Sequence, residues 1–401
     1  MRAVKLSTRF SMVRALRGLA AVAALALASA CADLSLPKPG GASDGIAVDV
    51  NQPVRVALLA PTGSSDPNLQ RIARDLVNAG RLAAQDVRNA QIDLQVYDDR
   101  GSFEGGQAAV QQALAEGAKI IVGPLLSTAT AGAEPAARAA KVNILSFSNN
   151  PSVAGPGTYL LGVTPGAAAS TLVSYGRSRG LSNYGVLYVQ GEAAEVIRDS
   201  VVASVNQGGG RVVSTQAYPF SQQGVTDAAA IMAATLVNAG ANAVILTDRS
   251  TAGLVADGLR ANGLGSAQAM MMGLQPWGQD ADTLNRASLQ GAVYAAPDPG
   301  LLAAFQGRYM TAYGERPDEL AVLAYDGVGA VGAMIAEARS KGGSPFSTQR
   351  ITNPQGFAGA NGAFRFFANG LSQRNLAVIE VQNGSAVVIA RAPRGFEQLG
   401  N

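Results

Sequence analysis

The chain has 401 residues, 48% of them apolar and 15% charged, so it can bury a sizeable core and is too long for one ordinary domain. Five of its 31 basic residues and none of its 28 acidic residues precede Cys31, so loss of that segment leaves 26 basic against 28 acidic residues, a net charge of −2. No basic arm or block remains, which argues against a nucleic-acid partner.

The first 30 residues have the organisation of an export signal. Residues 1–18 are basic, residues 19–28 form a short apolar run, and the small residues Ala28, Ser29 and Ala30 precede Cys31. The apolar run is too short to span a bilayer stably. We therefore expect residues 1–30 to be a signal peptide and the mature protein to be periplasmic.

Cys31 is the only cysteine, so no disulfide can form within the chain. The segment from Leu27 to Cys31 resembles a bacterial lipobox, whose cysteine receives a lipid and becomes the mature N-terminus. Ala28-Ser29-Ala30 also fits ordinary signal cleavage, so simple secretion is the alternative. Ala32 follows the cysteine, and the resemblance then implies an outer-membrane anchor. Residues 31–52, rich in Pro, Gly and Ser, predict a flexible tether.

From Pro53 onward, strand-like apolar runs alternate with helical patterns in two series. The expected strands are residues 54–60, 92–98, 119–123 and 142–148 in the first series, and 184–189, 211–218 and 243–248 in the second. Repeated βα units predict an α/β fold with two doubly wound parallel-sheet lobes, each with helices on both faces.

The C-terminal third has a different pattern. Residues 301–313 and 319–343 are helical in periodicity, whereas residues 362–391 alternate around Asn369-Gly370 and Asn383-Gly384, which are hairpin-turn dipeptides. We expect a small antiparallel edge here.

The composition also bears on chemistry. The chain has no histidine, and Cys31 is its only thiol, which removes the usual bases, nucleophiles and transition-metal ligands. Asp98 and Asp99 stand together at a strand end, where a turn or capping role is favoured over acid–base catalysis. We expect no enzymatic activity, no cofactor and no metal.

Hydroxyl groups follow the strand that ends near Val122. Ser127 and Thr128 stand where a helix begins, and a helix N-terminus at the carboxyl end of a parallel strand suits an anion. Ser148 and Asn150 follow the next strand of the series. The alternative is that Ser127 or Thr128 only caps the helix.

The second series offers polar strand ends of its own. Asp248 and Arg249 follow one strand, and Gln275 and Trp277 follow the next. Trp277 is the only tryptophan, and it is either a core anchor or a stacking lid for a ligand.

Four segments in order resemble the type I periplasmic binding proteins of the leucine/isoleucine/valine class: "VALLAPTG", "IVGPLLSTATAGAEPAARAAKVNILSFSNNP", "SYGRSRG" and "FQGRYMTAYGERPDELAVLAYDGV". The resemblance implies two lobes that close on a ligand and are joined by three crossovers, near residues 163–164, 291–293 and 341–343. Lobe one would comprise about residues 53–163 and 293–340, and lobe two about residues 164–292 and 341–401.

The same resemblance assigns site residues. Ser127 matches the position that holds an amino-acid carboxylate, and Ser148 and Asn150 match positions that hold the same zwitterion. Relatives that bind amino acids carry an acidic residue near the ligand ammonium, where this chain has Gln275 or Pro276. Asp248 or Glu192 could substitute, but Arg249 is adjacent to Asp248. The implied function is a solute receptor that delivers an amino acid, amide or peptide to an ABC permease.

One segment, "ILSFSNNPSVAGPGTYLLGVTP", resembles the penicillin-binding-protein activator lipoproteins more closely. The alternative function is therefore a lipid-anchored protein that regulates peptidoglycan synthesis through contact with a penicillin-binding protein.

Overall fold

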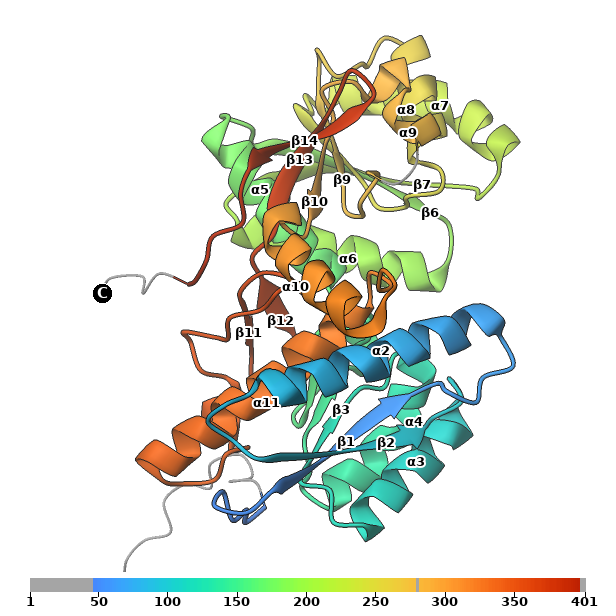
Figure 1. Ribbon diagram of the computed structural model, residues 1–401. Coiled ribbons are helices and arrows are strands. Elements are labelled where there is room, and N and C mark those ends of the chain that lie inside the picture. The colour runs from blue at the N-terminus through green and yellow to red at the C-terminus, as the bar shows by residue number, and fades with distance from the viewer. Residues whose placement is uncertain (1–45, 279–280, 397–401) are drawn as a thin grey trace, which may run out of the picture. The chain divides into compact units, whose positions relative to one another are not determined.

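A five-stranded parallel sheet forms the first half of the fold (Figure 1). The computed structural model describes residues 46–278 and 281–396, so Cys31, the signal peptide and most of the tether lie outside the described residues. The strand order is β2-β1-β3-β4-β5. The bounds are β1 Val54–Ala60, β2 Ile92–Asp98, β3 Ile120–Val122, β4 Ile144–Ser146 and β5 Thr158–Leu160.

Helices cover both faces of this sheet because alternate residues of β1 point to opposite sides. Val56 and Leu58 pack with α2, Pro67–Asp86, whereas Ala57 and Leu59 pack with α3, Phe103–Ala115, and α4, Ser127–Ala139. Both sets are fully buried, which explains why β1 is a nearly continuous apolar run. We call this sheet with its helices the first lobe.

The second lobe is built on a seven-stranded sheet of order β14-β13-β10-β9-β8-β6-β7. Strands β6 to β10 are parallel, and β13 and β14 add an antiparallel edge. The strand bounds are β6 Asn183–Val189, β7 Arg211–Tyr218, β8 Ala243–Leu246, β9 Met270–Gly273, β10 Val293–Ala296, β13 Ala377–Gln382 and β14 Ser385–Ala390.

The helices of the second lobe also lie on both faces of its sheet. One face packs against α5, Pro165–Ser178, and α6, Glu192–Gln207. The other face packs against α7, Gln222–Asn238, and α8, Ala252–Ala261. Short helices occur at η1 Pro151–Val153, α9 Ala281–Leu284 and η2 Ala287–Leu289.

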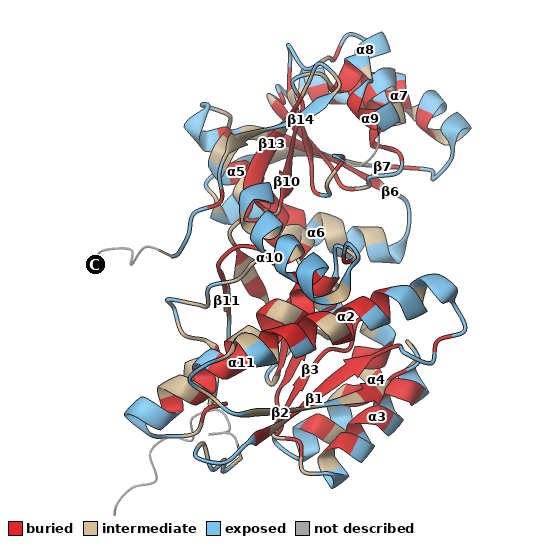
Figure 2. Cartoon of the chain, viewed as in Figure 1, coloured by how far each residue is buried: buried red, intermediate tan, exposed pale blue. Residues whose placement is uncertain are grey.

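The chain returns to the first lobe after β10. Helices α10, Pro299–Tyr313, and α11, Ala321–Lys341, both pack against α2, and Figure 2 shows α11 as largely buried. Among the described residues, α11 alone has the length and apolar composition of a membrane span, and 72% of that window is buried inside the fold. It is a core helix. The short helix α12, Thr348–Ile351, and the ribbon of β11, Phe364–Phe366, with β12, Ser372–Arg374, follow.

Two expected lobe boundaries differ from the structure. We expected lobe one to resume at residue 293, but β10 lies inside the second sheet, between β9 and β13. The break falls at Asp298, which caps α10 by accepting a hydrogen bond from the Gly300 N–H. We also expected lobe one to end at residue 340, whereas Phe346, Ile351 and Phe366 are part of its core. Hydrophobic burial, which the local pattern does not reveal, determines both assignments.

Both expected hairpin turns are present. Gly370 lies between β11 and β12, and Asn383-Gly384 lies between β13 and β14. Asn383 and Gly384 have φ angles of 50° and 73°, the left-handed conformation that a two-residue hairpin turn requires.

Candidate functional site

The order of the first sheet creates a point where successive connections leave in opposite directions. The chain goes from β1 to β2 on one side and then returns to place β3 on the other side of β1. Ligands of open α/β sheets bind at such a point, outside the carboxyl ends of the two strands. The loop after β3 leads directly to Ser127 and Thr128, so these predicted residues lie at the correct edge of the sheet.

The N-terminus of α4 has no side-chain cap. Leu126 occupies the N-cap position, and Ser127 is the first residue of the helix. The N–H groups of Ser127, Thr128 and Ala129 have no hydrogen-bond acceptor among the described residues, whereas the Thr130 N–H donates to the Leu126 carbonyl over 3.0 Å. Free N–H groups and the helix dipole make this end an acceptor of negative charge. The capping alternative for Ser127 and Thr128 is wrong.

The two predicted hydroxyls of α4 differ in their contacts. The Thr128 hydroxyl donates to the Gly101 carbonyl over 3.3 Å and so links α4 to the loop after β2. The Ser127 hydroxyl is partly exposed and has no hydrogen bond within the described chain. Ser127 is therefore the hydroxyl that is available to a ligand.

The loop after β4, the strand next to β3, carries Ser148 and Asn150. Ser148 is 5% exposed, and its hydroxyl accepts a hydrogen bond from the Asn150 N–H over 3.1 Å. The Asn150 carboxamide oxygen accepts from the Ser152 N–H over 3.0 Å and caps η1. Both side chains thus stabilise the loop itself, a local role that the sequence analysis did not anticipate.

The loops after β1 and β2 contribute residues that the sequence analysis assigned to a turn. Asp98 accepts hydrogen bonds from the N–H groups of Gly63 and Arg100 over 2.8 Å and 3.0 Å. A Cβ atom at Gly63 would lie 2.2 Å from Asp98 Oδ2, so a larger residue there would displace the Asp98 carboxylate from its present position. The pair therefore shapes the loops around the switch point.

Asp99 is fully buried, and only one of its oxygens is bonded. Oδ1 accepts a hydrogen bond from the Gly101 N–H over 2.8 Å, whereas Oδ2 has no partner. Burial raises the pKa of Asp99 from 3.8 to about 7, and the nearby charge of Asp98 adds to this effect.

The second sheet has its own switch point between β6 and β8, because β7 lies on one side of β6 and β8 on the other. The loop after β8 carries Asp248 and Arg249. Asp248 Oδ2 accepts hydrogen bonds from the Thr251 N–H and hydroxyl over 2.8 Å and 2.7 Å, so this carboxylate stabilises the start of α8. Arg249 is exposed and has no hydrogen bond or ion pair within the described residues.

Glu319, in the loop before α11, was not among the predicted site residues. Its side chain is exposed, but partial shielding of the carboxyl group and the neighbouring Asp318 raise its pKa, and Arg249 opposes that rise electrostatically. Glu319 is thus an acidic group close enough to interact with Arg249. Sequence separation conceals this relationship, because the two residues belong to different lobes.

The two predicted residues after β9 have different environments. Gln275 is exposed. Trp277 is 1% exposed and packs on Tyr294 with ring centroids 5.5 Å apart. A Cβ at Gly273 would lie 2.4 Å from Trp277 Cζ2, so the indole fills the space against the strand. Trp277 is a core anchor, and its assignment to the ligand site is wrong.

No cluster of three or more potential metal ligands of the His, Cys, Asp or Glu type occurs in the part of the chain that the structure describes. The strand-end groups are hydroxyls, amides, one exposed guanidinium and the carboxylates of Asp98, Asp99 and Asp248, which accept hydrogen bonds from their own loops. The hydroxyls, the amides and the guanidinium can bind and orient an anionic solute.

Comparison with known proteins defines the class. A sequence model of the family described as "Periplasmic binding protein" matches residues 53–386, and the chain belongs to this family. The curated protein sequences include no match to it. The architecture, two doubly wound lobes, is that of type I periplasmic binding proteins.

Three solved structures illustrate the shared fold. A protein assigned to branched-chain amino acid ABC transport in Rhodospirillum rubrum has a TM-score of 0.68 at 18% identity, over 84% of this chain and 100% of that one. A branched-chain amino acid periplasmic ligand-binding protein of Burkholderia xenovorans gives 0.65 at 16% identity, over 85% and 96%. An R. palustris solute-binding protein in complex with benzoate gives 0.56 at 15% identity, over 87% and 98%.

Proposed function

We propose that the protein is a non-enzymatic solute receptor that binds a small carboxylate and delivers it to an ABC permease. The observation that carries the proposal is the uncapped N-terminus of α4 at the switch point of the first sheet, with a free Ser127 hydroxyl. A carboxylate there would accept hydrogen bonds from the helix N–H groups and from Ser127.

The polar groups of the second lobe favour a carboxylate without a free ammonium group. Asp248 Oδ2 already accepts two hydrogen bonds from Thr251, which leaves mainly Oδ1 for a ligand ammonium, and the adjacent Arg249 opposes such a cation. Arg249 is exposed and offers a second cationic contact. A buried ammonium without a charge partner binds poorly. The benzoate complex of a relative with the same fold is an example of a solute with this chemistry.

The experiment is a thermal-shift screen of the full-length protein with benzoate, leucine and acetamide. Benzoate or a related carboxylate should stabilise the fold by about 2.7 kcal/mol at a hundredfold excess over its dissociation constant. Ser127→Ala should weaken binding by about 1 to 2 kcal/mol, because it removes one donor and leaves the backbone N–H groups. Ser385→Ala, an exposed serine on β14, is the matched control and should bind normally.

Leucine binding that is tighter than benzoate binding would contradict the preference for a carboxylate without an ammonium. Failure of every carboxylate to stabilise the protein would contradict the receptor function itself. The comparisons do not link the chain to the penicillin-binding-protein activators, so we do not propose that function.

We also propose that Cys31 carries a lipid that anchors the mature protein to the outer membrane. The single cysteine after an apolar signal supports this proposal. Cys31→Ser should release a soluble periplasmic protein, as measured by fractionation of cells. A correctly processed mutant that remained in the membrane fraction would contradict the lipid anchor.

A further inference from the structure

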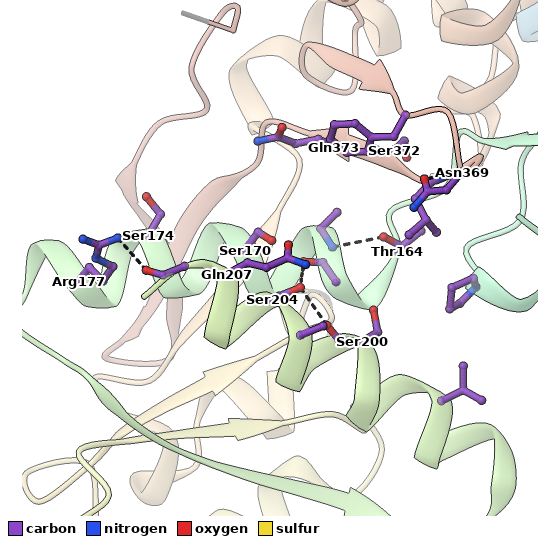
Figure 3. A pocket seen from close by; sticks show the side chains of 18 residues that line it. Thr164, Ser170, Ser174, Arg177, Ser200, Ser204, Gln207, Asn369, Ser372 and Gln373 are labelled. Carbon is purple, nitrogen blue, oxygen red and sulfur yellow. Dashed lines mark hydrogen bonds between the residues drawn. The ribbon is translucent and has the colours of Figure 1, made fainter. Parts of the chain in front are cut away.

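A cavity lies away from the switch points, on the face of the second lobe that α5 and α6 cover (Figure 3). Its volume is about 850 Å³, within the range of small-molecule sites in proteins. Its walls are α5, α6 and the connecting segment from Phe367 to Gln373, which follows β11 and includes the first two residues of β12. None of the eight predicted ligand-site residues lines it.

The walls are rich in neutral hydrogen-bonding groups. Two serines come from each helix, and amides come from α6 and the connecting segment: Ser170, Ser174, Ser200, Ser204, Gln207, Asn369 and Gln373. Hydroxyls and carboxamides both donate and accept hydrogen bonds, so they match a ligand that also does both. The set does not match a purely apolar ligand.

Charge at the cavity is confined to one residue. Arg177 is the only charged residue among those that line it, and its guanidinium donates to the Gly208 carbonyl over 2.7 Å. No acidic side chain from residues 46–278 or 281–396 lines the cavity. An ammonium-bearing ligand would therefore have no counter-charge here, whereas a neutral ligand or one with a single carboxylate fits.

One buried group independently indicates a ligand. Ser372 is 7% exposed and lines the cavity. Its backbone pairs with Phe366 in the β11–β12 ribbon, but its hydroxyl has no hydrogen-bond partner among the described residues. The oxygen itself is not sealed off from solvent, so it is accessible in the cavity, where a hydroxyl group of a ligand could hydrogen-bond with it.

An aromatic ring completes the set. Phe367 is 41% exposed and lines the cavity. The guanidinium of Arg365 lies 5.6 Å from the centre of the ring and helps to hold it in place. Exposed aromatic rings provide an apolar surface for ligands that combine C–H and O–H groups.

We infer that this cavity is a saccharide-binding site that is separate from the proposed carboxylate site. Serines, amides and one cation would bind sugar hydroxyls, and the Phe367 ring would cover an apolar face of the sugar. Thr164 lies in the connection from β5 to α5, and Ser372 lies in β12, just before the chain passes to β13, so a bound sugar would lie beside two connections between the lobes as well as α5 and α6.

The test measures binding of N,N′-diacetylchitobiose, maltose and leucine to the full-length protein by isothermal titration calorimetry. At least one disaccharide should bind at this cavity. Gln207→Tyr would place a ring in the cavity and should reduce the affinity more than tenfold. Asn206→Tyr is the matched control, because Asn206 is exposed on the same turn of α6 and does not line the cavity. It should bind like the native protein.

Ser372→Ala removes the serine hydroxyl and should weaken the sugar about two- to tenfold. Ser127→Ala should not change sugar affinity, which separates this site from the proposed carboxylate site. A longer probe, chitotetraose, distinguishes the source of the ligand. Tighter binding of the tetrasaccharide indicates a glycan chain, and weaker binding indicates a free sugar. The inference is wrong if neither disaccharide binds, or if Gln207→Tyr and Asn206→Tyr have equal effects.

Discussion

Asp326 and Arg374 form a buried ion pair in which Oδ2 and Nη1 are 2.7 Å apart and the side chains are 1% and 2% exposed. Arg374 also donates to the carbonyls of Gly362 and Leu161 over 3.1 Å and 3.2 Å. Asp326 accepts from the Ala360 N–H over 2.7 Å. The pair therefore fastens the core helix α11 to β12, to the loop before β11 and to the segment that follows β5.

Removal of one partner should be strongly destabilising. Arg374→Met leaves the carboxylate of Asp326 buried without its counter-ion, so we expect a loss of about 3 to 5 kcal/mol in the free energy of unfolding. Urea denaturation measures it. The double variant Asp326→Leu/Arg374→Met should recover part of the loss because no uncompensated charge remains. If the double variant is as unstable as the sum of the two single variants, the two residues do not act as a pair.

Asp99 should make stability depend on pH. Its pKa is raised from 3.8 to about 7 in the folded state, so the folded protein binds more protons than the unfolded chain between these values. The contribution of Asp99 to the free energy of unfolding is fully present below about pH 4. It is lost as the pH rises through 7, and the loss amounts to at most about 4 kcal/mol. Asp99→Asn should flatten this dependence. Thermal unfolding at pH 5 and pH 8 measures the effect, and an unchanged slope in the variant would assign it to another group.

A negative charge at the start of α4 should make the fold more stable but prevent a carboxylate from binding. Ser127→Asp places a carboxylate at the uncapped N-terminus, so we expect about 0.3 to 1 kcal/mol of added stability. The same charge should repel a solute carboxylate and abolish its binding. Thermal melts and calorimetry with benzoate measure the two effects. Ser127→Asn, which has the same shape without the charge, is the control and should retain binding. Retained benzoate binding in Ser127→Asp would place the anion site elsewhere.

Trp277 should affect stability and leave ligand affinity unchanged. Trp277→Phe leaves a cavity against Tyr294 and Gly273, so we expect a loss of stability, and Trp277→Ala should cost about 3 to 5 kcal/mol. Because Trp277 is the only tryptophan and is 1% exposed, its emission should be that of a buried indole and should not respond to solute. A fluorescence change on addition of solute would indicate that the indole is near the ligand.

The sequence predicted much of the fold because the patterns that define it are local. The βα repeats, the hairpin turns at Asn369-Gly370 and Asn383-Gly384, and the position of Ser127 at a strand end all follow from short segments. The lobe to which β10 belongs could not be predicted from a short segment, because a buried strand has the same apolar pattern in either sheet. The role of Asp248 was also hidden, since its bonds to Thr251 depend on the path of the loop. Glu319 and Arg249 are 70 residues apart in the chain, and only the tertiary fold relates them.

The path of the chain between the lobes has a consequence for biogenesis. Buried residues of α11, among them Val328 and Val331, complete the core on one face of the first sheet, although β1 to β5 end at Leu160. A nascent chain that has emerged only as far as α4 has α2 on that face but lacks α11, so the apolar face of the sheet is only partly covered. Its first lobe cannot complete its core until α11 is synthesised, and contacts of such long sequence separation form slowly.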